Sequence, residues 1–426
     1  MNSFDCIIGY DGVKNEMYQI IDMFKNGKKY ESIGARLPKG LMIYGKPGMG
    51  KTMLANALIE ECKVNTYKIV NNKSTQSLIK EINNSFKEAK DLDNSIILFD
   101  DLDKFSLDDE NKDKKIFSCI QSNIDSVKNK NILVIATVNN IYEIPNSLKR
   151  NGRFDRKIEL DSPSNKDCEK IIEYYLRKKR ISADLNLEDV SKMINYTSCA
   201  DLETVLNESA IFAAYENREE ININDIVSAH LRDQYDIPKE NYECSSDTIE
   251  STAIHEAGHV VVSEVLKEGS VGFVTIRAFG EDAMDGFTHI CDSLRRRPEN
   301  VLLALGGKIA CELFYRGRCA SGAQSDLEKA IEFIRDGLAR SGTGGVSFLD
   351  PTTSLFRDTS SAFDLKSEAV ISAELERFMF LGKEILLKNK DFLFKVVEEL
   401  KAKRSLLYSD IRRIRDSCNI TTIELH

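Results

Sequence analysis

The feature that most constrains this chain is a glycine-rich turn between an apolar run and a helix-compatible run. Its residues are Gly45, Lys46, Pro47, Gly48, Met49, Gly50, Lys51 and Thr52. They match the pattern G-x-x-x-x-G-K-[ST], which requires a strand before it and a helix after it; Leu41–Tyr44 and Met53–Cys62 supply these. In such a turn, backbone N–H groups and the helix N-terminus surround phosphate oxygens. The pattern therefore predicts an ATP site, with Lys51 against the β- and γ-phosphates and the Thr52 hydroxyl on Mg²⁺.

A second apolar run, Ser95–Phe99, ends in two carboxylates, Asp100 and Asp101. Alone, acids after a strand more often begin a loop or cap a helix. Beside the phosphate-binding turn, they predict that Asp100 helps to hold Mg²⁺ and that Asp101 polarises the attacking water. The next apolar run leads to Asn139, whose amide would orient water near the γ-phosphate, although such an Asn is usually a turn residue.

The patterning predicts a multidomain α/β plus α protein. Residues 1–164 alternate apolar runs with amphipathic stretches, which is typical of a parallel sheet covered by helices. The expected strands of this core are Leu41–Tyr44, Tyr67–Val70, Ile96–Phe99 and Ile132–Ala136. Residues 165–236 have helical periodicity and form a small lid, and residues 237–246 form a polar linker. Residues 247–426 are expected to be mostly helical, with short strands at Phe273–Ala278 and Gly286–Ile290.

Composition restricts the compartment and the partners. The ten cysteines are scattered without a CxxC pair, which favours reduced thiols and a cytoplasmic protein over a disulfide framework. A net charge of −9 argues against nucleic acid as a partner, because phosphate binding needs a concentrated basic surface. No stretch approaches the roughly 18 consecutive apolar residues of a transmembrane helix, so no membrane span is expected in this chain.

A second chemical motif, His255-Glu256-Ala257-Gly258-His259, lies in a helix-compatible run. Positions i and i+4 share one helix face, so the imidazoles of His255 and His259 can bind one zinc ion, with Glu256 beside it as general base. The alternative without a metal site is a helix with two surface histidines. The apolar flank Val260–Val262 and the scarcity of histidine, five in the whole chain, favour zinc.

A catalytic zinc ion needs a third protein ligand. The remaining histidines are His230 in the predicted lid, His289 in a predicted strand and His426 at the chain end. The residues alone do not choose between His289 and one of the many acids.

Taken together, these residues resemble the FtsH-type AAA+ zinc metalloproteases over nearly the whole chain. The matching segments, in chain order, are Ile8–Asp11, Pro38–Gly40, Gly45–Thr52, Gly152–Arg156, Ala200–Leu202, Thr252–His259 and Ser321–Leu327. The resemblance implies a P-loop AAA+ core, a helical lid and a zinc metallopeptidase domain, with Zn²⁺, ATP and Mg²⁺ as cofactors and proteins as substrates. It also implies that Asp326 is the third zinc ligand. The resemblance further implies a homo-hexamer, in which Arg153 and Arg156 match two family arginines that act on a neighbouring subunit. Substrate lies as a strand against a sheet edge, expected here near Gly286–Thr288.

The sequence departs from the family pattern in three places. The family carries membrane-spanning segments before the ATPase, whereas this sequence begins at the ATPase. Asp101 replaces a glutamate, which draws the carboxylate back by about 1.5 Å and predicts slow ATP hydrolysis, since such misplacement costs on the order of 100-fold. The stretch Asn71–Gln76 is polar where the family offers an aromatic-Val-Gly grip, which predicts weak pulling on stably folded proteins.

The leading hypothesis is an ATP-dependent zinc metalloendopeptidase that degrades unfolded or partner-delivered proteins. One alternative is a non-proteolytic remodelling or regulatory ATPase with a vestigial zinc domain; the intact His255, Glu256, His259 and Asp326 argue against it. Another is a largely ATP-independent ring peptidase, which Asp101 and the polar Asn71–Gln76 segment favour.

Overall fold

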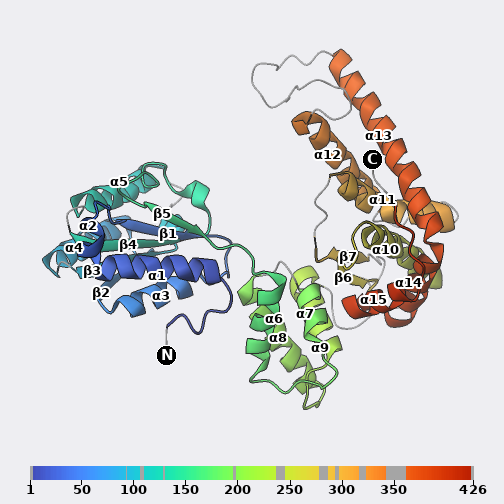
Figure 1. The fold of residues 1–426 in the computed structure, drawn as a ribbon, viewed down its shortest axis with the longest axis horizontal. Helices are drawn as coiled ribbons and strands as arrows, with labels where there is room; N and C mark the ends of the chain where they lie inside the picture. Colours follow the sequence, from blue (N-terminus) through green and yellow to red (C-terminus); the bar gives the residue numbers. More distant parts are fainter. Residues whose placement is uncertain are drawn as a thin grey trace. The chain divides into compact units, whose positions relative to one another are not determined.

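The structure is a computed structural model, drawn in Figure 1, in which the chain forms two compact units. Unit 1 consists of Met1–Tyr175 and Tyr196–Thr204, and unit 2 of Leu176–Asn195 and Val205–His426. The residues described are 3–92, 94–105, 110–127, 130–194, 198–236, 245–277, 286–292, 297–315, 323–341 and 361–423. Most of the predicted linker 237–246 lies outside this set, as do His426 and the first two residues of the Ser321–Leu327 motif.

Unit 1 contains a parallel sheet of five strands in the order β2-β3-β4-β1-β5. The strands are β1 (Gly40–Tyr44), β2 (Asn65–Val70), β3 (Asn94–Asp100), β4 (Asn131–Val138) and β5 (Arg156–Glu159). The first four confirm the predicted strands. β5 was not predicted, because its sequence Arg-Lys-Ile-Glu has one buried apolar side chain, Ile158. Pairing with β1, which brings Lys157 opposite Met42, makes it a strand.

Helices cover both faces of this sheet. Alternate residues of each strand point to opposite faces, so neighbouring residues pack against different helices. Leu41 and Ile43 pack with α1 (Asp11–Lys25) and α3 (Lys51–Cys62), whereas Met42 packs with α4 (Thr75–Leu92) and α5 (Glu110–Ser126). Short helical segments complete the unit: α2 (Gly27–Glu31), η1 (Leu102–Phe105) and η2 (Ile141–Glu143). Figure 1 shows α1 and α3 together on one side of the sheet and α5 on the other. The predicted α/β core is confirmed.

Four helices follow, in agreement with the helical periodicity of the sequence. They are α6 (Asn165–Leu176), α7 (Leu187–Met193), α8 (Cys199–Tyr215) and α9 (Ile223–Tyr235). Helix α9 begins with a capping box, in which Asn222 and Asp225 each accept a hydrogen bond from the other's backbone N–H. The division of the chain into residues 1–164, 165–236 and 247–426 stays a prediction.

The part of unit 2 that follows α9 is mostly helical, as predicted. Its helices are α10 (Ser246–Leu266), α11 (Arg297–Phe314), α12 (Ala323–Ser341), α13 (Ser361–Lys388), α14 (Lys390–Lys403) and α15 (Tyr408–Asp416). An antiparallel sheet, with strand order β7-β6-β8, consists of β6 (Val271–Thr275), β7 (Phe287–Ile290) and β8 (Ser405–Leu407). The first two correspond to the predicted short strands, and β8 was not predicted.

Helix α10 lies at the centre of the core of unit 2, where Val260 and Val261 are fully buried beside Leu305 and Ile309 of α11. The two helix backbones approach closely at Gly258, where a Cβ atom would lie 2.3 Å from the carbonyl oxygen of Gly306. This close packing fixes the helix that carries both predicted zinc histidines. In the part of the chain that the structure describes, no helix is both long and apolar enough to cross a bilayer.

Candidate nucleotide and zinc sites

The glycine-rich turn connects β1 to α3 in unit 1, as the sequence predicts. Gly48 and Gly50 have φ values of 76° and 87°, a backbone conformation that favours glycine. The Lys51 ammonium is buried beneath the turn, where it donates hydrogen bonds to the carbonyls of Gly45 and Lys46 at 2.9 and 2.7 Å. Burial lowers the pKa of Lys51, and the Asp101 carboxylate opposes this effect. The other residues of the turn, Lys46, Pro47 and Met49, link these positions.

Asp100, at the end of β3, lies beside the first residues of α3. Its Oδ1 accepts hydrogen bonds from the hydroxyls of Thr52 and Thr137, both at 2.8 Å, and its Oδ2 lies 2.7 Å from the Lys68 ammonium. Burial alone would raise the pKa of Asp100, but these three partners outweigh it and hold the pKa below its usual range. An adjacent hydroxyl and carboxylate are the hard oxygen donors that Mg²⁺ prefers, so Thr52 and Asp100 fit the predicted metal.

Asp101 and Asn139 also meet at this edge of the sheet. The amide of Asn139 lies 3.4 Å from Asp101 Oδ1, and the Lys104 ammonium lies 2.7 Å from Asp101 Oδ2. The Asp101 backbone N–H donates to the Thr137 hydroxyl at 2.8 Å. Sequence reasoning missed Thr137, Lys68 and Lys104. Thr137 could have been predicted as a site residue, because it lies on the next strand, two residues before Asn139.

The two predicted arginine fingers lie just before β5 and at its first residue. Arg153 forms a bidentate ion pair with Asp125, at 2.8 and 3.2 Å, within unit 1. Arg156 is the first residue of β5 and is exposed. Their action on a neighbouring subunit stays a prediction.

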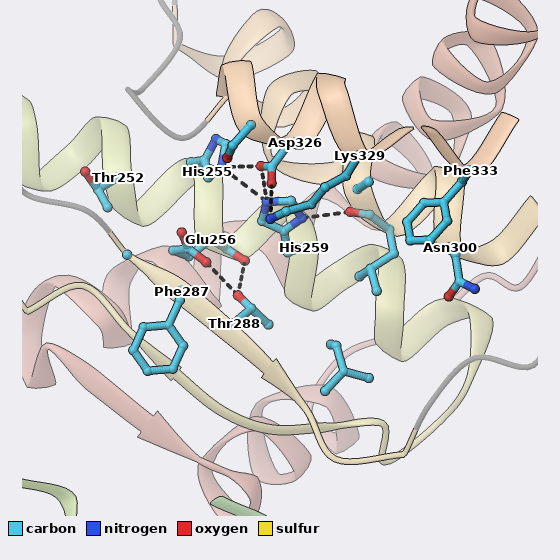
Figure 2. A pocket seen from close by; sticks show the side chains of 15 residues that line it. Thr252, His255, Glu256, His259, Phe287, Thr288, Asn300, Asp326, Lys329 and Phe333 are labelled. Atoms are coloured by element: carbon cyan, nitrogen blue, oxygen red, sulfur yellow. Dashed lines mark hydrogen bonds and ion pairs between the residues drawn. The ribbon is translucent and has the colours of Figure 1, made fainter. Parts of the chain in front are cut away.

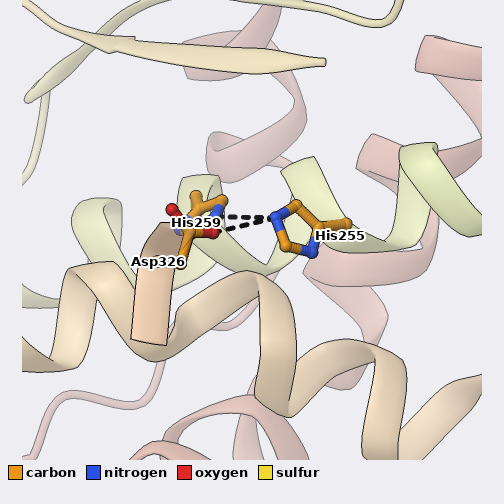
Figure 3. Close-up of side chains that lie close together, drawn as sticks. All are labelled: His255, His259 and Asp326. Atoms are coloured by element: carbon orange, nitrogen blue, oxygen red, sulfur yellow. Dashed lines mark hydrogen bonds and ion pairs between the residues drawn. The ribbon is translucent and has the colours of Figure 1, made fainter. Parts of the chain in front are cut away.

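In unit 2, the structure brings together the three predicted zinc ligands. His255 and His259 lie one turn apart on α10, and Asp326 lies in the first turn of α12 (Figure 3). The Nε2 atoms of the two imidazoles are 3.2 Å apart, and each lies 3.0 Å from Asp326 Oδ2. Among the described residues, these three form the group of metal-binding side chains whose ligand atoms lie within 4.8 Å of one another.

These distances fit a tetrahedral zinc ion. Ligands about 2.0–2.1 Å from a tetrahedral centre lie roughly 3.3 Å from one another, which is close to the measured separations. Burial alone would raise the pKa of Asp326, but the adjacent imidazoles of His255 and His259 outweigh it and hold the pKa well below its usual range. The anionic carboxylate and the two imidazoles are suitable zinc donors.

Neighbouring groups orient the imidazoles. His259 Nδ1–H donates to the Leu303 carbonyl at 2.8 Å, which leaves the lone pair of Nε2 free for a metal. His255 Nδ1 lies 4.0 Å from the Cys311 thiol, a weaker partner. Gly307 packs so closely that a Cβ atom there would lie 2.5 Å from His255 Nε2 and 2.6 Å from His259 Nε2. A glycine at this position gives both rings room.

Glu256 and the three predicted zinc ligands line one pocket, which has a volume of about 440 Å³ (Figure 2). Burial raises the pKa of Glu256, although the nearby imidazoles of His259 and His255 favour its ionised form. The Thr288 hydroxyl, on β7, donates a hydrogen bond to Glu256 Oε2 at 2.7 Å. Sequence reasoning did not assign Thr288 this contact with the predicted base.

The other histidines lie elsewhere. His289 lies on β7 and is not a member of the metal-binding group. His230 is buried in α9 against Tyr235 and Phe273, and burial lowers its pKa to about 3. The geometry therefore favours Asp326 over His289 as the third ligand.

Comparisons with known proteins match each unit. Residues 41–162 match the model of the ATPase family associated with various cellular activities (AAA), and residues 243–414 match the model of Peptidase family M41. Three relatives share the name ATP-dependent zinc metalloprotease FtsH. The protein of Lachnoclostridium phytofermentans is 30% identical, and the alignment covers 96% of this chain and 74% of the relative.

Two further relatives give similar results. The protein of Karelsulcia muelleri is 28% identical over 97% of this chain and 71% of the relative. That of Mycoplasma pneumoniae is 29% identical over 97% of this chain and 62% of the relative. The chain thus spans between 62% and 74% of the length of these three proteins.

Proposed function

Because this chain belongs to the FtsH family of ATP-dependent zinc metalloproteases, we propose that it hydrolyses peptide bonds at His255, His259 and Asp326 and uses ATP to deliver its substrates. The observation that carries this proposal is the buried triangle of two imidazoles and one carboxylate, with Glu256 facing the same pocket. His255, His259 and Asp326 would hold zinc. When bound, zinc polarises the substrate carbonyl and lowers the pKa of water to about 7.

The side chains of unit 2 then handle the proton. Glu256, as the carboxylate, accepts a proton from the attacking water and returns it to the departing amine. The Thr288 hydroxyl holds Glu256 Oε2, which leaves Oε1 to face the water. β7 is an edge strand of its sheet and lies next to Glu256, so an extended peptide can add to it as a further strand. Phe287 and Thr288 of β7 both line the pocket (Figure 2).

In unit 1, Lys51 and the backbone of Gly45–Thr52 would bind the phosphates, and Thr52 with Asp100 would bind Mg²⁺. Asp101 and Asn139 would orient the attacking water, because they meet at one edge of the sheet. We further propose that Arg153 and Arg156 act on a neighbouring subunit of a homo-hexamer. Arg153 would first have to leave Asp125.

We propose unfolded or partner-delivered proteins as substrates, since an extended chain can pair with the edge strand β7 at the pocket and Asn71–Gln76 is polar. We also propose a reducing, cytoplasmic location. The eight cysteines of the described residues all carry free thiols, which supports it.

Degradation of casein tests the proposal. We expect cleavage that requires ATP and zinc, that stops in a chelator and that returns when zinc is added back. The variant Lys51→Ala separates the two main readings. If it degrades casein as fast as the wild type while its rings still form, the protein is a largely ATP-independent peptidase, a reading that Asp101 favours.

A further inference from the structure

Lys68 is brought to the nucleotide site by the register of the sheet. On the edge strand β2, Lys68 lies opposite Leu98 of β3, and Val70 lies opposite Asp100. Lys68 and Asp100 are therefore diagonal neighbours on one face of the sheet. The intervening Ile69 points into the core on the opposite face.

Both carboxylate oxygens of the predicted metal ligand Asp100 have partners. Lys68 Nζ lies 2.7 Å from Asp100 Oδ2, while the hydroxyls of Thr52 and Thr137 donate to Oδ1. The Asp100 side chain is 13% exposed and the Lys68 side chain is 46% exposed. The largely buried Asp100 carboxylate thus lies beside the positive charge of Lys68. The Lys68 side chain is flexible and half-exposed, so it can change its conformation.

We propose that Lys68 is a positioning residue that neutralises Asp100 before Mg²⁺ binds, and thereby sets how strongly nucleotide binding depends on Mg²⁺. This inference rests on the ATP site of the proposed function. Without Mg²⁺, an uncompensated carboxylate would repel the triphosphate, and the Lys68 ammonium cancels that repulsion. When Mg²⁺ is bound, its charge would neutralise Asp100 instead, so the Lys68 ammonium would contribute less to nucleotide binding.

The test compares the wild-type chain with its Lys68→Met variant. The affinity for a fluorescent, non-hydrolysable ATP analogue is measured in Mg²⁺ and in EDTA. The quantity of interest is the ratio of Kd in EDTA to Kd in Mg²⁺. We expect Lys68→Met to raise this ratio by about five-fold, a modest effect because solvent screens a half-exposed pair.

Three variants make the interpretation specific. Lys68→Arg retains the charge and should keep the wild-type ratio. Lys87→Met removes an exposed lysine from α4 and should also keep it. In an Asp100→Asn background, Lys68→Met should have no further effect on the ratio, because no carboxylate remains to be neutralised.

The outcomes distinguish a wrong role for Lys68 from a wrong ATP site. An unchanged ratio in Lys68→Met, with or without a general loss of affinity, overturns the role of Lys68; equal weakening in both media would mean that Lys68 contacts phosphate directly. If the wild type does not bind the analogue in Mg²⁺, the ATP site itself is wrong and the inference fails with it.

Discussion

Gly307 offers a sharp test of the zinc site, since the substitution Gly307→Ala adds a single methyl group. The new Cβ atom would lie 2.5 Å from His255 Cε1 and Nε2 and 2.6 Å from His259 Nε2, whereas ordinary contacts begin at 3.4 Å. Each ring must therefore move by about 1 Å, a displacement that costs on the order of 100-fold in rate. We expect zinc affinity to fall by about 10- to 100-fold, the usual cost of disturbing groups around a metal ligand.

The assay is zinc competition with a chelating dye, together with cleavage of an unstructured peptide at saturating zinc. Global stability should change little, because alanine favours the helical conformation of α11 by up to about 1 kcal/mol over glycine, which offsets part of the cost of crowding the two rings. Gly382→Ala is the matched control: its Cβ would crowd the Cδ1 atom of Ile309, a methyl group at the end of a flexible side chain, and not the imidazoles. Wild-type zinc affinity and activity in Gly307→Ala would refute the argument that this glycine makes room for the two rings.

Two further predictions concern other groups. Asp101→Glu extends the carboxylate by about 1.5 Å and should raise steady-state ATP hydrolysis by roughly 10- to 100-fold, and Asp101→Asn should abolish it; a slower Asp101→Glu enzyme would show that the short side chain does not limit the rate. Burial lowers the pKa of His230 from 6.5 to about 3, so the unfolded chain binds a proton that the folded chain excludes, and stability falls as pH decreases through that range. Between pH 7 and pH 5, the wild type should lose about 2 kcal/mol more than His230→Phe in urea unfolding, and equal losses would contradict a buried neutral imidazole.

The residues of each candidate site that lie close together in the sequence could be grouped from the sequence alone. The glycine-rich turn, the acids after β3 and the histidines of α10 are each contained in one short segment, whose periodicity fixes their relative positions. The strands β5 and β8 were missed, because Arg156–Glu159 and Ser405–Leu407 are too short to show alternation. They are strands because β1 and β6 pair with them.

Contacts between distant segments could not be predicted from the residues alone. Asp326 is separated from His259 by 67 positions and was assigned only through the family resemblance. The packing of α10 against α11, and of α11 against α12, places that aspartate beside the imidazoles. The contacts of Lys68 with Asp100 and of Thr288 with Glu256 likewise depend on strand register and on the tertiary placement of a strand beside a helix.

The central claim is that one zinc ion is held by His255, His259 and Asp326 and that Glu256 is the base. The most direct measurement is metal content and casein cleavage on the same preparations of the wild type and Glu256→Gln. We predict one zinc per chain in both proteins, and a loss of cleavage by about 100- to 10,000-fold in the variant. Unimpaired cleavage by Glu256→Gln, or a wild type that cleaves casein without bound zinc, would contradict the claim.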